Sequence, residues 1–333
     1  MAEPRFLIVR LSSLGDIVHA FPAVGGLRES FPDAEIVWLT HPKWEALVRA
    51  ANLANEVWTV NTRDWASLRG ILYRIRKQTV DAAIDFQGLW KSASIPFLAR
   101  VPRRIGFSSE TVREAGVPLL YTDRVRVNAA LHVADQNGEL SLRVGAKQRT
   151  AEVAIQITPE DSASVKDALR KQEISEYIVL SPGGGWRSKC WPAERFGKLA
   201  LRILDELHLR CVLNAGPGEE DLVAATIAAA GSARPTPYSG NLGQLTALLK
   251  NASAVVAGDT GPLHLADAVG APIVAIFGPT DPARNGPYRH NGVVLRWEGA
   301  ETTYKRGTEA DASLLHISVD EVLSALRGLR ESA

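Results

Sequence analysis

The residues best suited to chemistry lie in polar, glycine-rich breaks that directly follow short apolar runs. One break, Gly258–Gly261, follows a β-branched run and precedes apolar residues at helical spacing. Thr260 is suited to cap that helix and Pro262 to its first position. Amides of a helix's first turn attract anions, so the pattern predicts a phosphate cradle. An ordinary tight turn between strand and helix explains the pattern equally well.

Two more breaks in the second half supply charged side chains. The triple-glycine loop of residues 183–185 ends in Lys189, and the break at 216–219 ends in Glu219. Backbone amides, a fixed cation and a carboxylate for ribose hydroxyls are what a nucleoside diphosphate site needs. Lys189 could equally be a surface lysine. His264, one turn into the helix, either lines the site or, the reading we favour, is a partly buried histidine with its own partners.

In the first half, Asp16 ends the polar break that follows the strand-like run Phe6–Leu11. Open α/β sheets place chemistry at the carboxyl edge of a strand, so Asp16 is a candidate general base. It is also a good helix-capping residue, and the two roles are compatible. The break lacks the G-x-G-x-x-G spacing of dinucleotide sites, which argues against a dehydrogenase.

Metal-dependent phosphate chemistry has no signature in the sequence. Aspartates never stand two positions apart, and the triple-glycine loop of residues 183–185 is not followed by the Lys-Ser or Lys-Thr of a Walker loop. The two cysteines, Cys190 and Cys211, lack metal-ligand spacing and do not make a disulfide framework. We therefore expect no metal and no cofactor, with the leaving group's charge met by Lys189, amides and a helix dipole.

Basic residues are concentrated in the first half of the chain. Residues 1–150 contain 20 Lys and Arg against 15 Asp and Glu, although the whole chain has a net charge of +1. This mild excess does not suggest nucleic-acid binding, but it fits an acidic substrate or an anionic membrane face. Arg63, close to Trp65, suits anionic sugars or phosphates. The basic helix that follows, through Lys77, is more typical of a solvated face.

The elements that must position these residues form two similar halves. A chain of 333 residues, 46% hydrophobic and 23% charged, fits two soluble α/β domains. In each half, strands alternate with helices, and the pattern changes between Val144 and Asp161. We therefore predict two Rossmann-like domains that face each other across a cleft. The absence of a long apolar segment indicates a cytosolic protein that touches a membrane at most from its surface.

Four segments together resemble the family 9 glycosyltransferases, the ADP-heptose:lipopolysaccharide heptosyltransferases. They are FLIVRLSSLGDIVHAFPA, DFQGLWKSA, PGGGWRSKCWP and GDTGPLHLADAVGAPIVAIFGPTDP, in that order over nearly the whole chain. The resemblance implies a GT-B fold. It implies an acceptor domain over residues 1–155, a nucleotide-sugar donor domain over 156–315, and a last helix within 316–333 that packs back on the N-terminal domain.

The resemblance also implies the reaction. The donor is ADP-L-glycero-β-D-manno-heptose, the acceptor is Kdo-lipid A on the cytoplasmic face of the inner membrane, and transfer inverts the anomeric centre without a metal. DFQGLWKSA, and Gly106-Phe107 followed by residues 111–114, are more similar to heptosyltransferase I than II. The alternatives are a heptosyltransferase II-like enzyme with another donor or acceptor, a sugar-nucleotide epimerase, and a non-catalytic nucleotide-sugar sensor.

Matched position by position, the resemblance assigns roles to individual residues. Asp16 would be the general base, Lys189 would face the diphosphate, and Glu219 would bind the ribose. The other donor residues would be Gly184, Gly185, Asp259, Thr260, Gly261 and His264. The acceptor residues would be Ser13, Arg63, Gln87, Lys91 and Arg113. Some family members have hydroxyl residues where this chain has Gly184 and Gly185, so backbone amides must contact the diphosphate there.

Overall fold

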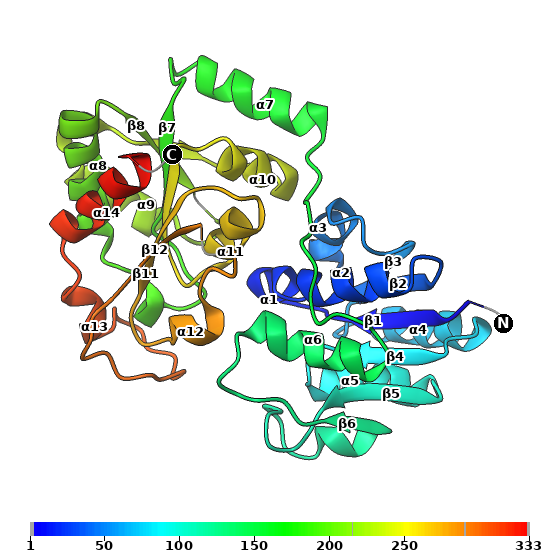
Figure 1. The fold of residues 1–333 in the computed structure, drawn as a ribbon. Coiled ribbons are helices and arrows are strands. Elements are labelled where there is room, and N and C mark those ends of the chain that lie inside the picture. Colours follow the sequence, from blue (N-terminus) through cyan, green and yellow to red (C-terminus); the bar gives the residue numbers. More distant parts are fainter. Residues whose placement is uncertain (1–2, 215, 290, 332–333) are drawn as a thin grey trace. The chain divides into compact units, whose positions relative to one another are not determined.

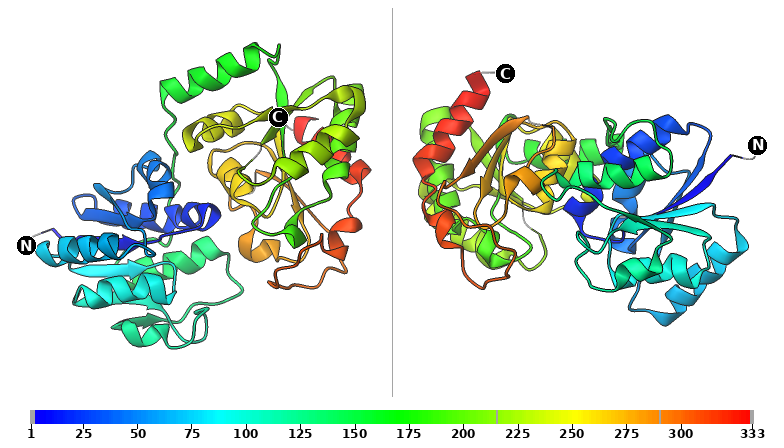
Figure 2. Two further views of the ribbon diagram at one scale, coloured as in Figure 1. Left: turned by 180° about the vertical axis from the view of Figure 1, so that it is seen from behind. Right: turned by 60° about the horizontal axis from the view of Figure 1, so that its bottom comes forward.

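The computed structural model describes residues 3–214, 216–289 and 291–331. The chain divides between Gln156 and Ile157 into two compact units, an N-terminal unit and a C-terminal unit. Figures 1 and 2 show that each unit is a twisted sheet with helices on both faces. None of the helices in the described part of the chain combines the length and apolar character needed to span a membrane.

The N-terminal unit is built on a six-stranded sheet in the order β3-β2-β1-β4-β5-β6. Every strand pair in it is parallel. Its strands are β1 (Arg5–Val9), β2 (Glu35–Thr40), β3 (Glu56–Thr59), β4 (Ala82–Asp85), β5 (Arg103–Phe107) and β6 (Asp123–Val125). Its helices are α1 (Leu14–Val18), α2 (Phe21–Ser30), η1 (Pro42–Trp44), α3 (Glu45–Ala50), α4 (Trp65–Lys77), α5 (Trp90–Leu98), η2 (Val117–Leu120) and α6 (Val133–Arg143).

Strand β1 is buried on both faces, which is why it reads as a continuous apolar run. Leu7 and Val9 lie in one core cluster with Ile71 and Ile75 of α4. Phe6 points to the other face, where its ring meets that of Phe31, just after α2, at 5.3 Å between centroids. Helix α2 packs on α6 over that second face.

The C-terminal unit repeats this topology, with sheet order β12-β11-β10-β7-β8-β9 and parallel pairing throughout. Its strands are β7 (Tyr177–Ser181), β8 (Arg210–Asn214), β9 (Thr236–Tyr238), β10 (Ala254–Gly258), β11 (Ile273–Phe277) and β12 (Gly292–Arg296). Its helices are α7 (Pro159–Arg170), η3 (Arg187–Lys189), α8 (Ala193–Leu207), α9 (Glu220–Ala229), η4 (Gly231–Ala233), α10 (Leu242–Lys250), α11 (Gly261–Ala268), α12 (Pro282–Asn285), α13 (Ala312–Leu315) and α14 (Val319–Glu331).

The last helix, α14, packs within the C-terminal unit, and its packing back on the N-terminal domain stays a prediction. Its buried side chains Val322, Leu323 and Leu326 belong to the core of the C-terminal unit, together with residues of α8, β10 and β11. Its recorded packing partners are α8, β11 and β12. The amphipathic face that the sequence shows therefore covers the second sheet, whose apolar surface would otherwise be exposed.

Each sheet reverses its strand order once, between β1 and β4 in the N-terminal unit and between β7 and β10 in the C-terminal unit. Ligands of open α/β sheets bind outside the carboxyl ends of the strands at such a switch point. The breaks that contain Asp16 and Gln87 follow β1 and β4, and those that contain Lys189 and Asp259 follow β7 and β10. The topology therefore gives each unit one candidate site.

Candidate active site

Asp16 is held in the first turn of α1 by both of its carboxylate oxygens. Oδ2 accepts hydrogen bonds from the Ser13 backbone N–H at 3.0 Å and from the Ser13 hydroxyl at 2.8 Å. Oδ1 forms an ion pair with Arg10 Nη2 at 2.7 Å. Asp16 is thus not the N-cap residue that the sequence offered as an alternative, because Ser13 is the N-cap of α1; Asp16, at the third helical position, binds back to it as in a capping box. About a third (31%) of the Asp16 side chain stays exposed.

The charges around Asp16 keep it ionised. Burial alone would raise its pKa, but the Arg10 charge, the hydrogen bonds from Ser13 and the charge of Arg113 outweigh burial and lower the pKa to about 2. Arg10 is itself buried, which lowers its pKa, and it donates a hydrogen bond to the Phe86 carbonyl. The carboxylate of Asp16 therefore accepts hydrogen bonds throughout the physiological pH range.

Gln87 connects the breaks after β1 and β4. Its Oε1 accepts from the Leu11 N–H at 2.8 Å, and its Nε2 donates to the Ser12 hydroxyl at 3.4 Å. The turn that contains Gln87 is anchored by buried Asp85, whose Oδ1 accepts from the N–H groups of Gln87 and Gly88 at 2.9 and 3.3 Å. The structure therefore brings Gln87 next to the loop that contains Ser13 and Asp16.

The other acceptor residues inferred from the sequence are exposed. Arg113 lies close enough to Arg10 and Asp16 to shift the pKa of both. Lys91 lies in the first turn of α5, and Arg63 lies in the loop before α4, where its backbone N–H donates to Asn61 Oδ1. No recorded contact in the described part of the chain joins Lys91 or Arg63 to Asp16, so their roles stay predictions.

In the C-terminal unit, a buried charge cluster lies at the ends of β7 and β10. Lys189 Nζ forms an ion pair with Asp259 Oδ2, and Asp259 Oδ1 lies 3.2 Å from His264 Nε2. All three residues are less than a tenth exposed. Burial raises the pKa of Asp259, but His264 and Lys189 outweigh it and lower the pKa below its usual range. His264 is thus a buried histidine with its own partner, as we favoured from the sequence, and it lies at the edge of the candidate site.

The same cluster shows that Lys189 is a buried lysine in an ion pair and not a surface lysine. Its ammonium lies 4.1 Å from the centroid of the Trp186 ring, and its charge is compensated by Asp259. Arg306 lies over the same ring at 5.2 Å. Sequence reasoning gave no role to Trp186 or Arg306. The contact between Trp186 and Lys189 could have been predicted from the sequence, because a tryptophan stands in a glycine loop that ends in a lysine and aromatic faces attract cations.

Thr260 is the N-cap residue of α11, as the sequence suggested, but its side chain makes no capping hydrogen bond. Its hydroxyl oxygen is buried and has no hydrogen-bond partner among the described residues. A buried polar atom without a partner is costly, and a ligand oxygen at the helix N-terminus would satisfy it. Gly258 lets the chain pass here, because a Cβ at this position would lie 2.9 Å from the Lys189 carbonyl oxygen.

The glycine loop after β7 lies against Glu219 and Thr260. A Cβ added to Gly183 would lie 1.9 Å from Glu219 Oε1, and one added to Gly184 would lie 3.4 Å from Thr260 Cγ2. Glu219 Oε2 accepts a hydrogen bond from the Gly216 N–H at 2.8 Å. Ala215, which precedes this turn, lies outside the described residues. The predicted donor residues Gly184, Glu219 and Thr260 are thus brought together by the C-terminal unit.

Within the described ranges, no group of three or more His, Cys, Asp or Glu side chains is arranged to hold a metal ion. The candidate site therefore consists of two sets of residues. In the N-terminal unit they are Ser13, Asp16, Gln87 and Arg113, with Arg10 as a buried partner. In the C-terminal unit the glycines of residues 183–184, Glu219 and Thr260 adjoin the Lys189–Asp259–His264 cluster.

Comparison with known proteins identifies the family. The family model "Glycosyltransferase family 9 (heptosyltransferase)" matches residues 69–313. The chain belongs to glycosyltransferase family 9. This family 9 member is 24% identical to the lipopolysaccharide core heptosyltransferase OpsX of Haemophilus influenzae, with 91% of this chain and 88% of that protein covered. It is 27% identical to lipopolysaccharide heptosyltransferase 1 of Escherichia coli K12, with 88% and 93% covered.

Solved structures agree with this assignment. The E. coli heptosyltransferase WaaC with ADP matches at a TM-score of 0.78 and 25% identity, covering 98% of this chain and 99% of that one. The predicted fold class is confirmed: the family 9 enzyme has the GT-B architecture of two Rossmann-like units. It is a glycosyltransferase, as the sequence indicated.

Proposed function

We propose that this glycosyltransferase transfers heptose from ADP-L-glycero-β-D-manno-heptose to Kdo of the lipopolysaccharide inner core. The names of the relatives support heptose as the sugar and the lipopolysaccharide core as the acceptor. The solved relative with bound ADP supports an ADP-linked donor. In this proposal the N-terminal unit holds the acceptor and the C-terminal unit holds the donor.

The observation that carries the proposal is the ionised, partly exposed carboxylate of Asp16 at the switch point of the N-terminal sheet. The acceptor hydroxyl would form its bond to the anomeric carbon while the bond to the diphosphate breaks, which inverts that carbon. Because the pKa of Asp16 is about 2, Asp16 is a weak base toward a free hydroxyl. The proton would therefore move to Asp16 late, after the new carbon–oxygen bond has made the hydroxyl acidic.

The leaving ADP would be received by the C-terminal unit. The Thr260 hydroxyl and the amides of the first turn of α11 would contact the diphosphate, with Glu219 near the ribose. Asp259 carries a negative charge, so direct contact with phosphate would be repulsive. We assign Asp259 instead the role of orienting Lys189 and His264, which it already contacts.

The acceptor also defines where the enzyme would act. Kdo-lipid A is anchored in the inner membrane, and the donor is a cytoplasmic nucleotide sugar. The enzyme would therefore work peripherally on the cytoplasmic face of that membrane.

A transfer assay with defined acceptors tests the proposal. The protein is incubated with ADP-heptose and Kdo-lipid A, and the mass of the lipid product is measured by mass spectrometry. We expect the mass of one heptose to be added to Kdo-lipid A, and NMR of the product to show an inverted anomeric centre. Addition only to an acceptor that already carries heptose would indicate heptosyltransferase II activity instead. No addition to either acceptor would refute the proposal.

A further inference from the structure

The outer face of α4 is unusual for a solvated helix. Trp65 and Tyr73 are 73% and 64% exposed, although large aromatic side chains normally contribute to a core. They lie eight positions apart, so they share one side of the helix with Arg69 between them. The opposite side carries Ile71 and Ile75, which are buried in the core of the N-terminal unit. The core therefore explains the inner face of α4 and leaves the outer face without a packing role.

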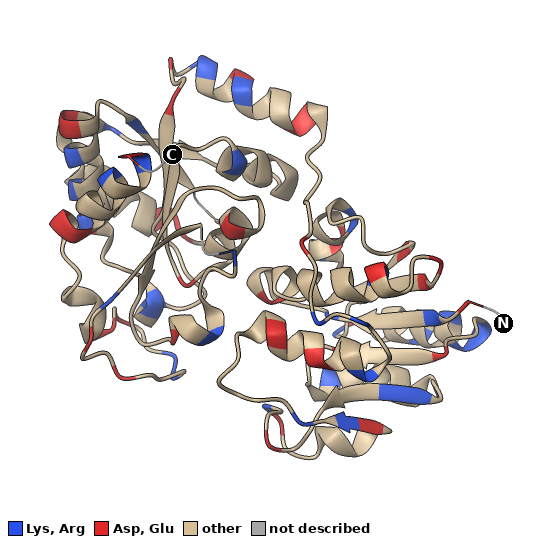
Figure 3. Ribbon diagram, in the orientation of Figure 1, with Lys and Arg blue, Asp and Glu red and all other residues tan. Residues whose placement is uncertain are grey.

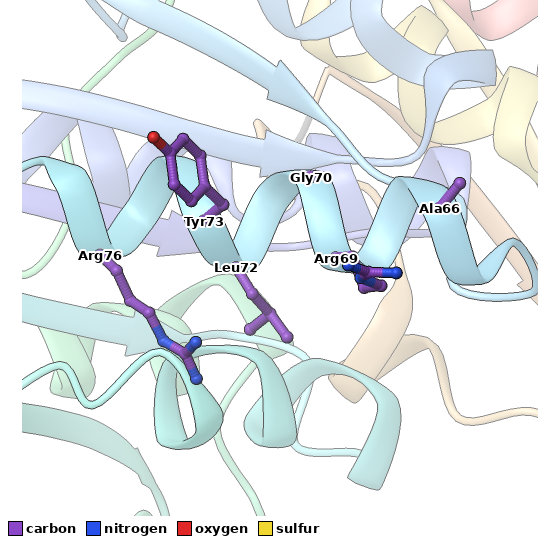
Figure 4. A pocket seen from close by; sticks show the side chains of 6 residues that line it. All are labelled: Ala66, Arg69, Gly70, Leu72, Tyr73 and Arg76. Carbon is purple, nitrogen blue, oxygen red and sulfur yellow. The ribbon is translucent and has the colours of Figure 1, made fainter.

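This outer face is also hollowed. An open groove of about 540 Å³ is lined by Ala66, Arg69, Gly70, Leu72, Tyr73 and Arg76, all on α4. Figure 4 shows Leu72 and Arg76 extending toward one edge of the helix and Tyr73 toward the other. The groove exists because Ala66 and Gly70 have little or no side chain, and a Cβ at Gly70 would meet no atom within 4 Å.

The end of α5 continues the face. Phe97 and Leu98 are 43% and 49% exposed. Arg76 Nη2 donates to the Leu98 carbonyl at 2.8 Å, which fixes α5 beside α4. The guanidinium of Arg104 lies 5.5 Å from the Phe97 ring centroid. Exposed apolar side chains here are thus interleaved with arginines over two helices.

The charge of this region is predominantly positive. Between Arg63 and Arg104 the sequence has nine Lys and Arg but three Asp and Glu, and of these Asp85 is buried. Helix α4 itself carries four cations and no acid, which Figure 3 shows as blue segments. In the described part of the chain no acidic side chain forms an ion pair with Arg69 or Lys77, whereas Arg74 is paired with Glu56 at 2.7 Å. An anionic partner would therefore meet uncompensated cations here.

We propose that this face, the α4–α5 face (Trp65, Arg69, Tyr73, Arg76, Lys77, Phe97 and Leu98), docks the enzyme on an anionic lipid bilayer. Aromatic rings and aliphatic side chains enter the headgroup boundary, and arginine and lysine contact lipid phosphates. Helix α4 begins at the carboxyl edge of the sheet, the edge that also carries Asp16. Docking would therefore bring lipid headgroups to the side of the unit that holds the acceptor. The purpose of docking rests on the proposed function, but the binding of the α4–α5 face to lipid can be tested without it.

Vesicle flotation of the full-length protein tests the docking directly. Wild type should float with vesicles of phosphatidylcholine and phosphatidylglycerol and much less with phosphatidylcholine alone. Arg69→Glu/Lys77→Glu replaces two positive charges with two negative ones but leaves the Arg76–Leu98 contact, so partitioning should fall on the order of 100-fold. The matched control Lys166→Glu/Lys198→Glu changes exposed lysines of the C-terminal unit by the same charge and should float like wild type. Equal loss in both variants, or no flotation of wild type, overturns the proposal.

The contribution of the aromatic side chains to lipid binding can be measured separately, at high salt. Trp65→Ser/Tyr73→Ser should remove the part of the binding that survives high salt, because apolar insertion is not screened whereas charge attraction is. A wild-type dimer without lipid that becomes monomeric in this variant would show that a second copy covers the face, and would overturn the proposal.

Transfer assays with membrane-embedded and soluble acceptors distinguish docking on the bilayer from the transfer reaction. Arg69→Glu/Lys77→Glu should lower transfer to acceptor embedded in vesicles and leave transfer to a deacylated, soluble acceptor unchanged. If wild type transfers to neither acceptor but still floats, the proposed function fails and the docking surface stands. Equal loss of transfer to both acceptors would place these residues in the site and contradict docking.

Discussion

At the scale of single residues, the site depends on buried partners that compensate each functional charge. Arg10 holds Asp16 ionised, and Asp259 holds Lys189 in place. Loss of Asp259 would leave the buried charge of Lys189 uncompensated, which is strongly destabilising in proteins. Asp16 is partly exposed, so loss of Arg10 leaves its charge in contact with solvent. The two charges to which we assign functional roles are therefore positioned by buried partners.

Arg10 allows a pH prediction. In wild type the pKa of Asp16 is about 2, so activity should not be lost through protonation of Asp16 until the pH approaches that value. Arg10→Gln removes the ion pair, and burial, which raises the pKa, is then less opposed. The acid limb of kcat/KM against pH should therefore move upward, toward the usual pKa of an aspartate.

The control for this change is Arg5→Gln, which removes an arginine that pairs with Glu35 at the start of β1, away from the site. Its pH profile should match that of wild type. An unmoved acid limb in folded Arg10→Gln would contradict the role of Arg10.

The ion pair between Arg10 and Asp16 also stabilises the folded state at pH values above the unfolded-state pKa of Asp16. This contribution is lost as the pH falls through about 2.

At the scale of elements, the glycine loop after β7 is shaped by its contact with Glu219. Gly183→Ala would place a Cβ on the Glu219 carboxylate and force that side chain away from the Gly216 N–H. If Glu219 binds the ribose, the Kd for ADP should rise about tenfold, consistent with an overpacking cost of about 1–3 kcal/mol. Isothermal calorimetry measures the change.

Gly185→Ala is the matched control, because its added Cβ meets no atom within 4 Å. ADP should bind this variant as it binds wild type. Unchanged ADP binding in Gly183→Ala would show that the position of Glu219 does not matter to the nucleotide, and would remove Glu219 from the donor site.

The sequence predicts elements best where a strand is buried on both sides. The runs of β1, β7 and β10 were found because a continuous apolar run followed by a polar glycine break is typical of parallel strands. The edge strands β6 and β9 have only three residues each and partly exposed side chains, so they show no such run. The alternating residues 150–158 form an extended connection rather than a strand, because they bond to Pro22 and Ala50 individually.

At the scale of the whole molecule, what the sequence could not show are contacts between distant segments. Asp16 and Thr260 could be named from local pattern. The hydrogen bond from Arg10 to the Phe86 carbonyl and that from the Leu11 N–H to Gln87 depend on β1 lying beside β4, because each joins residues that are 76 positions apart. The placement of α14 depends likewise on which sheet its apolar face covers. Both follow from topology, which residue spacing alone does not determine.

The division of labour between the two units is the central claim: Asp16 of the N-terminal unit acts on the acceptor, and the C-terminal unit binds ADP. Asp16→Asn tests it most directly, with heptose transfer and ADP affinity measured on one preparation. Asparagine keeps an oxygen for the Ser13 bonds but cannot take a proton. The account predicts transfer reduced by about 10²–10⁴-fold with an unchanged Kd for ADP. Transfer at the wild-type rate, or equal loss of ADP binding, would contradict it.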